Sequence, residues 1–244
     1  MFLPSVPPQT AMSIADALAE VRAHLEAAAR AAGRDPSGVR LVAVSKTFPV
    51  DAVLEAYAAG QRHFGENRVQ EGLAKVEATS QLPGIRWHLL GHLQSNKAKK
   101  AAAAFGTIQS LDGVDLLRRL DQGAVDAGTT PELLIQVDLA GEVTKFGARP
   151  DEVPPIFEEA ARCRAARVVG LMLLPPAPDT PEDARPWFRR LREHRDRWLS
   201  AGVPAPMLRE LSMGMSGDYA VAVEEGATIV RVGTAIFGRR DVQR

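Results

Sequence analysis

The sequence has one cysteine, Cys163, in 244 residues. A single cysteine cannot form a disulfide within the chain, and no cysteine cluster is available to bind a metal ion. This cysteine usage predicts a reducing compartment, the cytoplasm. His88 and His92 lie four positions apart, but Gly91 interrupts a helical pair and no third ligand is near, so no metal site is predicted.

The sequence also has no excess of positive or negative charge. Lys plus Arg and Asp plus Glu both number 30, which gives a formal net charge of +0. A balanced chain gives no reason to expect nucleic acid or an acidic membrane as partner. The balance and the absence of a long apolar surface stripe favour a monomer.

Long hydrophobic runs are missing as well. No stretch approaches the roughly 18 apolar residues of a membrane span, and the first residues lack the basic and apolar regions of a secretory signal. The proline-containing segment 1–12 is predicted to be a flexible extension, and residues 13–244 are predicted to form one domain.

Short apolar runs alternate with helical patterns along the rest of the chain. A first helix is predicted over 13–32, with Ser13 as N-cap, Asp16 in the capping-box position and Gly33 as terminator. The apolar runs that follow cover residues 41–45, 62–65, 87–91, 107–110, 133–139, 168–174, 210–213 and 228–232. The helical patterns between and after them cover residues 49–59, 67–78, 95–104, 113–127, 150–164, 180–201, 216–225 and 234–237.

Continuous apolar strands that are each followed by a helix indicate a buried parallel sheet. Eight such units in about 250 residues predict one closed (β/α)8 barrel with an extra N-terminal helix. An open dinucleotide-binding sheet is disfavoured because no GxGxxG follows the first strand. In a (β/α)8 barrel the site lies at the carboxyl ends of the strands.

Lys46 directly follows the first apolar run, LVAVS. A partly desolvated lysine has a lowered pKa, and its neutral amine can attack an aldehyde to form a Schiff base. The alternative is a solvated lysine that opens the loop.

Two turns late in the sequence predict a phosphate site. The segment ELSMGMSGDY places Ser212, Gly214, Ser216 and Gly217 between the seventh strand and a helix. In RVGTAIFG, Gly233 and Thr234 follow the eighth strand. Phosphate sites of (β/α)8 barrels often use these two loops, whose backbone N–H groups can hold an anion.

Arg231 lies within the eighth apolar run, two residues before Gly233. A buried arginine requires an acceptor, because an unpaired buried charge is costly. Two acceptors remain open: a pyridine nitrogen of a ligand, or a carboxylate such as Glu210.

Several sequence segments, taken together, match the pattern of a known protein family. They are AVSKTF, HFGENRVQE, WHLLGHLQSNK, GLMLLPP and ELSMGMSGDYAVAVEEGATIVRVGTAIFG. From about Leu41 to Gly238 the chain resembles the YggS/PROSC family of pyridoxal phosphate homeostasis proteins. That family resembles the N-terminal barrel of alanine racemase and belongs to the fold-type III proteins that bind pyridoxal 5′-phosphate (PLP).

The resemblance implies a role for each of nine residues. It implies that Lys46 forms the Schiff base with PLP and that Arg231 faces the pyridine nitrogen. The phosphate would be held by Ser212, Ser216, Gly233 and Thr234, and the pocket would be completed by Asn67, His88 and Met213. In VDLAGEVTKFG the segment Lys145-Phe146-Gly147 is kept, but Asp138 stands where the family usually has Asn.

The function expected from this resemblance is the sequestration and delivery of PLP, with PLP-dependent apo-enzymes as possible recipients. A racemase needs a proton-transfer group on each face of its substrate, and eight β/α units leave no second domain to supply one beside Lys46. One alternative is a small racemase or decarboxylase that uses His88 or a water as the second acid. Another is a PLP-free Schiff-base aldolase that acts on a sugar phosphate.

Overall fold

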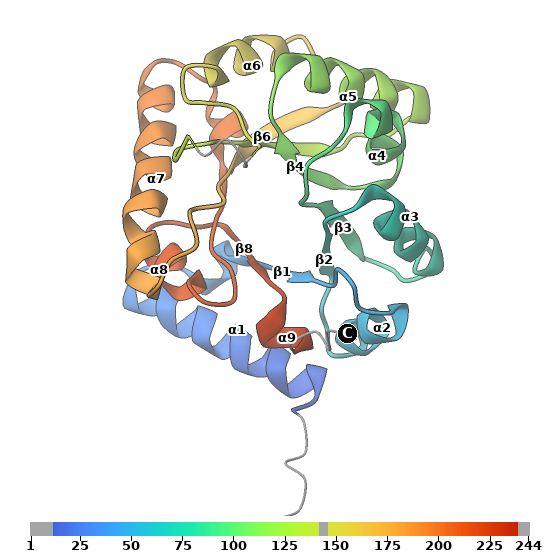
Figure 1. Ribbon diagram of the computed structural model, residues 1–244, viewed down its shortest axis with the longest axis vertical. Coiled ribbons are helices and arrows are strands. Elements are labelled where there is room, and N and C mark those ends of the chain that lie inside the picture. Colours follow the sequence, from blue (N-terminus) through green and yellow to red (C-terminus); the bar gives the residue numbers. More distant parts are fainter. Residues whose placement is uncertain (1–11, 142–145, 239–244) are drawn as a thin grey trace, which may run out of the picture.

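A closed barrel of eight parallel strands forms the centre of the computed structural model, which describes residues 12–141 and 146–238 (Figure 1). The strands follow one another around the barrel in chain order, and β1 pairs with β8 to close it. They are β1 (Arg40–Val44), β2 (His63–Glu66), β3 (Arg86–Leu89), β4 (Thr107–Leu111), β5 (Glu132–Gln136), β6 (Arg167–Met172), β7 (Glu210–Ser212) and β8 (Ile229–Val232). The predicted (β/α)8 barrel is confirmed.

Helices surround this barrel (Figure 1). They are α1 (Ile14–Ala31), α2 (Val50–Ala58), α3 (Val69–Ala78), α4 (Ala98–Ala104), α5 (Val114–Ala127), α6 (Val153–Ala160), α7 (Arg185–Ser200), α8 (Tyr219–Glu224) and α9 (Thr234–Phe237). Short 3₁₀ turns are η1 (Pro36–Gly38), η2 (Ser95–Lys97), η3 (Pro181–Ala184) and η4 (Ala205–Leu208). Within the described ranges, no helix is both long and apolar enough to cross a membrane.

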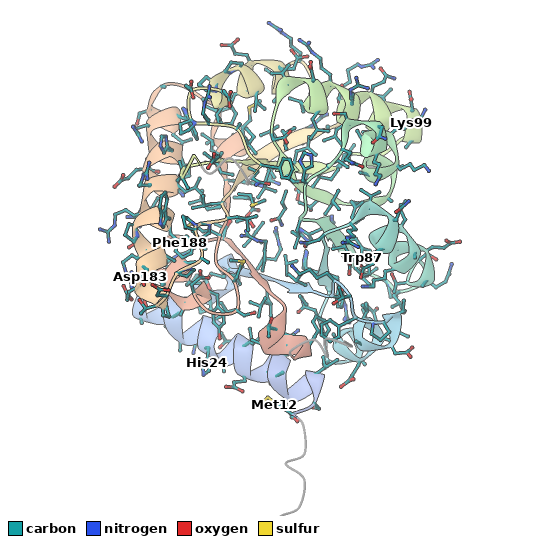
Figure 2. The ribbon with its side chains drawn as sticks, in the orientation of Figure 1. Met12, His24, Trp87, Lys99, Asp183 and Phe188 are labelled. Carbon is teal, nitrogen blue, oxygen red and sulfur yellow. The ribbon has the colours of Figure 1, made fainter. Side chains whose placement is uncertain are left out.

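The extra N-terminal helix α1 packs against α8 and α9 (Figure 1). Its N-cap is as predicted: the Ser13 hydroxyl accepts the N–H of Asp16 at 3.1 Å. Its buried face is formed by Leu18, Val21 and Leu25, while His24 lies exposed on the outer face (Figure 2). The predicted extension 1–12 falls outside the described residues except for Met12.

Three helices are at least four residues shorter than predicted, and prolines explain two of them. The pattern over 150–164 yields only α6, which begins at Val153 with prolines in its first turn. The pattern over 180–201 is divided into η3 and α7, each with a proline at its start. Proline favours the first turn of a helix and pushes the residue before it out of helical conformation. In the third case, α8, the segment 216–218 forms a turn in which Asp218 accepts the N–H of Met215 at 2.6 Å.

The apolar core has two layers. Most buried side chains lie between the strands and the helices, among them Trp87 of β3 and Phe188 of α7 (Figure 2). A separate small cluster consists of Val42, Leu134, Val169, Met172 and Ile229. The buried polar residues of the strands include His88, Gln109, Ser212 and Arg231, and these four lead to the candidate site.

Candidate functional site

A cavity of about 460 Å³ opens at the carboxyl end of the barrel. Its walls come from the segments that follow β1, β2, β3, β6 and β7, together with the end of β8 and the turn after it. The lining residues are Val44, Lys46, Asn67, Leu90, Leu174, Met215, Ser216, Gly217, Arg231, Gly233 and Thr234. Parallel strands present their carboxyl ends on one face, so residues from both ends of the chain meet here.

Six predicted site residues therefore share one cavity. They are Lys46, Asn67, Ser216, Arg231, Gly233 and Thr234. Lys46 is half-buried two residues after the end of β1. The structure thus brings the predicted amine and the two predicted phosphate turns to the same rim.

The two late turns are joined through Ser216. Its hydroxyl oxygen accepts the N–H groups of Gly233 at 3.3 Å and of Ala235 at 3.4 Å. A side chain at position 233 would crowd β1, because a Cβ there would lie 3.1 Å from the carbonyl oxygen of Val44. Glycine therefore allows the backbone after β8 to approach the rim, where two backbone N–H groups meet the Ser216 hydroxyl. Such a concave set of donors suits an anion.

Arg231 has no carboxylate as hydrogen-bond acceptor among the described residues. Its Nη1 donates to Ser212 Oγ at 2.6 Å, and its Nη2 donates to the carbonyl oxygen of Leu173 at 2.8 Å. The salt bridge to Glu210, one of the two alternatives, is wrong: Glu210 lies 3.5 Å from Arg40 and accepts the hydroxyl of Thr228 at 2.6 Å.

The guanidinium of Arg231 stays charged although it is buried. Burial lowers its pKa to about 10, and the charge of Asp218 acts in the opposite direction. Because Arg231 also lines the cavity, it offers a positive charge and N–H groups to an uncharged acceptor such as an aromatic nitrogen.

Behind Arg231, a chain of hydrogen bonds runs through the barrel. Ser212 Oγ donates to Gln109 Oε1 at 2.6 Å. Gln109 Nε2 lies 3.1 Å from His88 Nδ1, and His88 Nε2 lies 3.0 Å from His63 Nδ1. Arginine can only donate, so the direction of every later bond is fixed. His88 must therefore accept at Nδ1 and carry its proton on Nε2.

Both histidines of this hydrogen-bond chain, His63 and His88, are neutral at neutral pH. Burial, the neighbouring His63 and the charges of Arg40 and Arg86 hold the pKa of His88 well below its usual value. Burial and the same two arginines lower the pKa of His63 to about 4. A neutral imidazole can accept at one nitrogen and donate at the other, as the chain requires.

Three predicted site residues are not in the cavity wall. His88 is fully buried within the barrel and hydrogen-bonded on both ring nitrogens, so it lies below the rim. Met213 packs in the outer core cluster, and Met215 takes its place in the wall. Ser212 contacts Arg231 and not the cavity. That these three residues contact a ligand therefore stays a prediction.

Asp138, two residues after the end of β5, has a local role. Asp138 accepts the N–H groups of Ala140 at 3.1 Å and Gly141 at 2.9 Å, so it stabilises a turn. Lys145 lies outside the described residues, and the exposed ring of Phe146 stacks on His92 at 3.5 Å between centroids.

Sequence reasoning missed the role of Gln109 and the apolar walls. Leu90 and Leu174 line the cavity, but leucines at strand ends carry no distinguishing signal. Gln109 had one available signal, since it is a polar residue in the middle of a buried strand.

One rim of this β/α barrel carries a lysine, an arginine and the glycine-containing turn that suits an anion. These features define a class of protein: a barrel that can hold a phosphorylated carbonyl compound. Comparison with known proteins gives the family. The family model described as "Alanine racemase, N-terminal domain" matches residues 17–241. A pyridoxal phosphate homeostasis protein of Aquifex aeolicus (strain VF5) is 40% identical over 232 residues, which cover 94% of this chain and 99% of that protein. The chain belongs to the alanine racemase N-terminal-domain family and, within it, to the pyridoxal phosphate homeostasis proteins.

Solved structures agree with this assignment. PipY of Synechococcus elongatus PCC7942, solved with PLP bound, superposes with a TM-score of 0.81 at 42% identity, covering 93% of this chain and all (100%) of that one. An alanine racemase of Clostridium difficile 630 superposes with a TM-score of 0.68 at 15% identity, covering 93% of this chain and 58% of that chain. The second likeness shows the shared fold alone.

Proposed function

We propose that this protein binds pyridoxal 5′-phosphate through a Schiff base on Lys46 and acts as a carrier in PLP homeostasis. The observation that supports this most directly is that Lys46, Arg231 and the turn of Ser216, Gly233 and Thr234 line one cavity. PLP requires an amine for its aldehyde, donors for its phosphate and a partner for its ring nitrogen. The cavity offers one of each.

The chemistry of the residues that line the cavity also suits PLP. The guanidinium of Arg231 is buried, positively charged and hydrogen-bonded only to uncharged protein acceptors, so an aromatic nitrogen beside it would remain unprotonated. Asn67, on the wall, supplies further polar contact. When bound, PLP supplies an electron sink, and a cation beside its ring nitrogen weakens that sink. This arrangement favours holding PLP over using it.

A racemase or decarboxylase function lacks a second proton-transfer group at this cavity. Among the described lining residues, Lys46 and Arg231 are the only ionisable side chains. His88, the earlier candidate for the second acid, is buried below the cavity and bonded on both nitrogens. We therefore propose that the protein is not an amino-acid racemase, in line with the homeostasis proteins it resembles.

The test begins with the absorbance spectrum of the purified protein after incubation with PLP. Borohydride reduction and peptide mapping should place the ligand on Lys46, and Lys46→Ala should abolish the reducible adduct while the protein stays folded. An adduct that persists in the variant, or one that maps to another lysine, would contradict the assignment. A sugar-phosphate aldolase would form its adduct without PLP, so the same mapping separates that alternative.

A panel of D- and L-amino acids tests the carrier role itself. Turnover at about 1 per second or faster, a rate typical of enzymes, would refute it. We further propose that the protein is a cytoplasmic monomer that passes PLP to apo-enzymes. Recovery of activity by a PLP-dependent apo-enzyme mixed with the loaded protein, at a rate above that of free release, would support delivery. Sedimentation would establish the oligomeric state.

A further inference from the structure

The main chain on both sides of Lys46 is held by side chains from β2 and α3. On the amino-terminal side, Ser45 is fully buried. Its N–H donates to the carbonyl oxygen of Gly65 at 3.0 Å, and its hydroxyl donates to Glu66 Oε1 at 2.7 Å. Its carbonyl oxygen accepts Lys75 Nζ at 2.8 Å. Every polar group of Ser45 is thereby engaged.

On the carboxyl-terminal side, Thr47 has an unusual backbone. Its φ of +69° lies in the left-handed region, and it is the one non-glycine residue there among the described residues. A β-branched residue is strained in this region. The N–H of Thr47 donates to Glu71 Oε1 at 2.5 Å, a charge-assisted bond that opposes the strain.

Lys75 connects the two sides. Its Nζ donates to the carbonyl oxygen of Ser45, to Glu66 Oε1 at 2.7 Å and to Glu71 Oε1 at 3.1 Å. These three bonds use all three protons of the ammonium group, so Lys75 is unsuited to attack an aldehyde. Lys46, in contrast, lines the cavity.

The pair of Glu66 and Lys75 is almost completely buried, with side chains 0% and 5% exposed. Buried ion pairs are weak sources of stability, because the loss of hydration offsets their attraction. What this pair supplies is geometry: it fixes the carbonyl oxygen and the hydroxyl of the residue before Lys46.

We propose that Glu66, Glu71 and Lys75 form a clamp that positions Lys46 for Schiff-base formation. These are positioning residues, since none of them lines the cavity. The proposal rests on the proposed function of Lys46. It predicts a selective effect: loss of the clamp weakens the covalent capture of PLP and leaves the contacts to ring and phosphate unchanged.

The experiment compares two ligands. Pyridoxine 5′-phosphate has the ring and the phosphate of PLP but an alcohol in place of the aldehyde, so it cannot form a Schiff base. In Glu71→Ala, we expect the affinity for PLP to fall about tenfold, as for the loss of one charge-assisted hydrogen bond. The affinity for pyridoxine 5′-phosphate should stay within about twofold of the unmodified protein. Glu77→Ala, an exposed position on the same helix, serves as the matched control and should leave both affinities unchanged.

A second variant tests how Glu71 acts. Glycine adopts the left-handed conformation without a steric penalty. In a Thr47→Gly background, the effect of Glu71→Ala on PLP affinity should therefore shrink from about tenfold to about twofold. A purely structural role of Glu71 would give the same loss in both backgrounds.

The outcomes separate the clamp from the proposed function. Equal losses for the two ligands, or an unchanged PLP affinity in Glu71→Ala, would overturn the clamp. The Lys46→Ala variant tests the Schiff base independently, since it should lower PLP affinity toward that of pyridoxine 5′-phosphate. If Lys46→Ala left PLP affinity unchanged, the proposed function itself would fail, whatever the clamp variants show.

Discussion

Replacing Gln109 by methionine tests the hydrogen-bond chain behind Arg231. Methionine has a similar length and no hydrogen-bonding amide, so Gln109→Met removes the acceptor of the Ser212 hydroxyl and the donor to His88 Nδ1. All three residues are 0% exposed, so water cannot replace the lost partners. Each unsatisfied buried group costs about 1–3 kcal/mol.

The amide of Gln109 no longer has to be desolvated, which offsets part of this cost. We therefore expect the free energy of unfolding to fall by about 2–4 kcal/mol. For a domain of this size, that corresponds to a decrease in Tm of about 5–15 °C. Urea unfolding followed by circular dichroism measures the first quantity, and a thermal scan measures the second.

Gln122→Met is the matched control, because Gln122 is exposed and both of its side-chain hydrogen bonds, the one it donates to Asp126 and the one it accepts from Arg164, lie at the surface. Its free energy of unfolding should change by no more than about 0.5 kcal/mol. If Gln109→Met lost as little as this control, the chain would not be a structural unit. An imidazole ¹⁵N spectrum gives an independent check: His88 should be neutral with its proton on Nε2, and the other tautomer would contradict the direction assigned to the chain.

Two further predictions concern pH and the turn after β7. The pKa of His88 and of His63 is lowered in the folded protein, so the unfolded chain binds more protons than the folded one below about pH 6.5. The free energy of unfolding should therefore fall as the pH decreases from about 6.5 toward 4. The slope is up to about 1.4 kcal/mol per pH unit for each histidine. Urea unfolding at several pH values measures this slope, which His63→Gln should reduce; an equal slope in the variant would refute the assignment. Gly214→Ala should destabilise the protein by about 2–4 kcal/mol, because φ is +93° there and a Cβ would lie 2.6 Å from the Cβ of Ala222. Gly113→Ala, where a Cβ meets nothing within 4 Å, is its control, and equal effects of the two substitutions on chemical denaturation would contradict this explanation.

The barrel and its rim could be predicted because strands buried on both sides appear as continuous apolar runs. Each predicted run overlaps one strand of the structure, and Lys46 comes two residues after the end of β1. Position in the chain was therefore enough to place Lys46 and the two glycine turns on the same rim.

The depth of a side chain in the barrel could not be predicted in the same way. His88 and Met213 lie near strand ends in the sequence, yet one is directed into the barrel core and the other into the outer core cluster. Which layer a residue joins depends on the register between neighbouring strands, and a single sequence does not carry that information. The same reason hides the chain from His63 to Arg231, whose members come from five different segments of the barrel wall.

Closure of the barrel between β1 and β8 has a consequence for synthesis on the ribosome. Lys46 is translated before Arg231, Gly233 and Thr234, which belong to the last β/α unit of the barrel. A nascent chain that ends at β7 has the amine and lacks half of the cavity, so it cannot hold the proposed ligand by the contacts described here. Only a chain whose last strand has joined the first presents both halves, and a ligand that binds this state alone stabilises it by mass action. Uptake of the proposed ligand would then report that folding is complete.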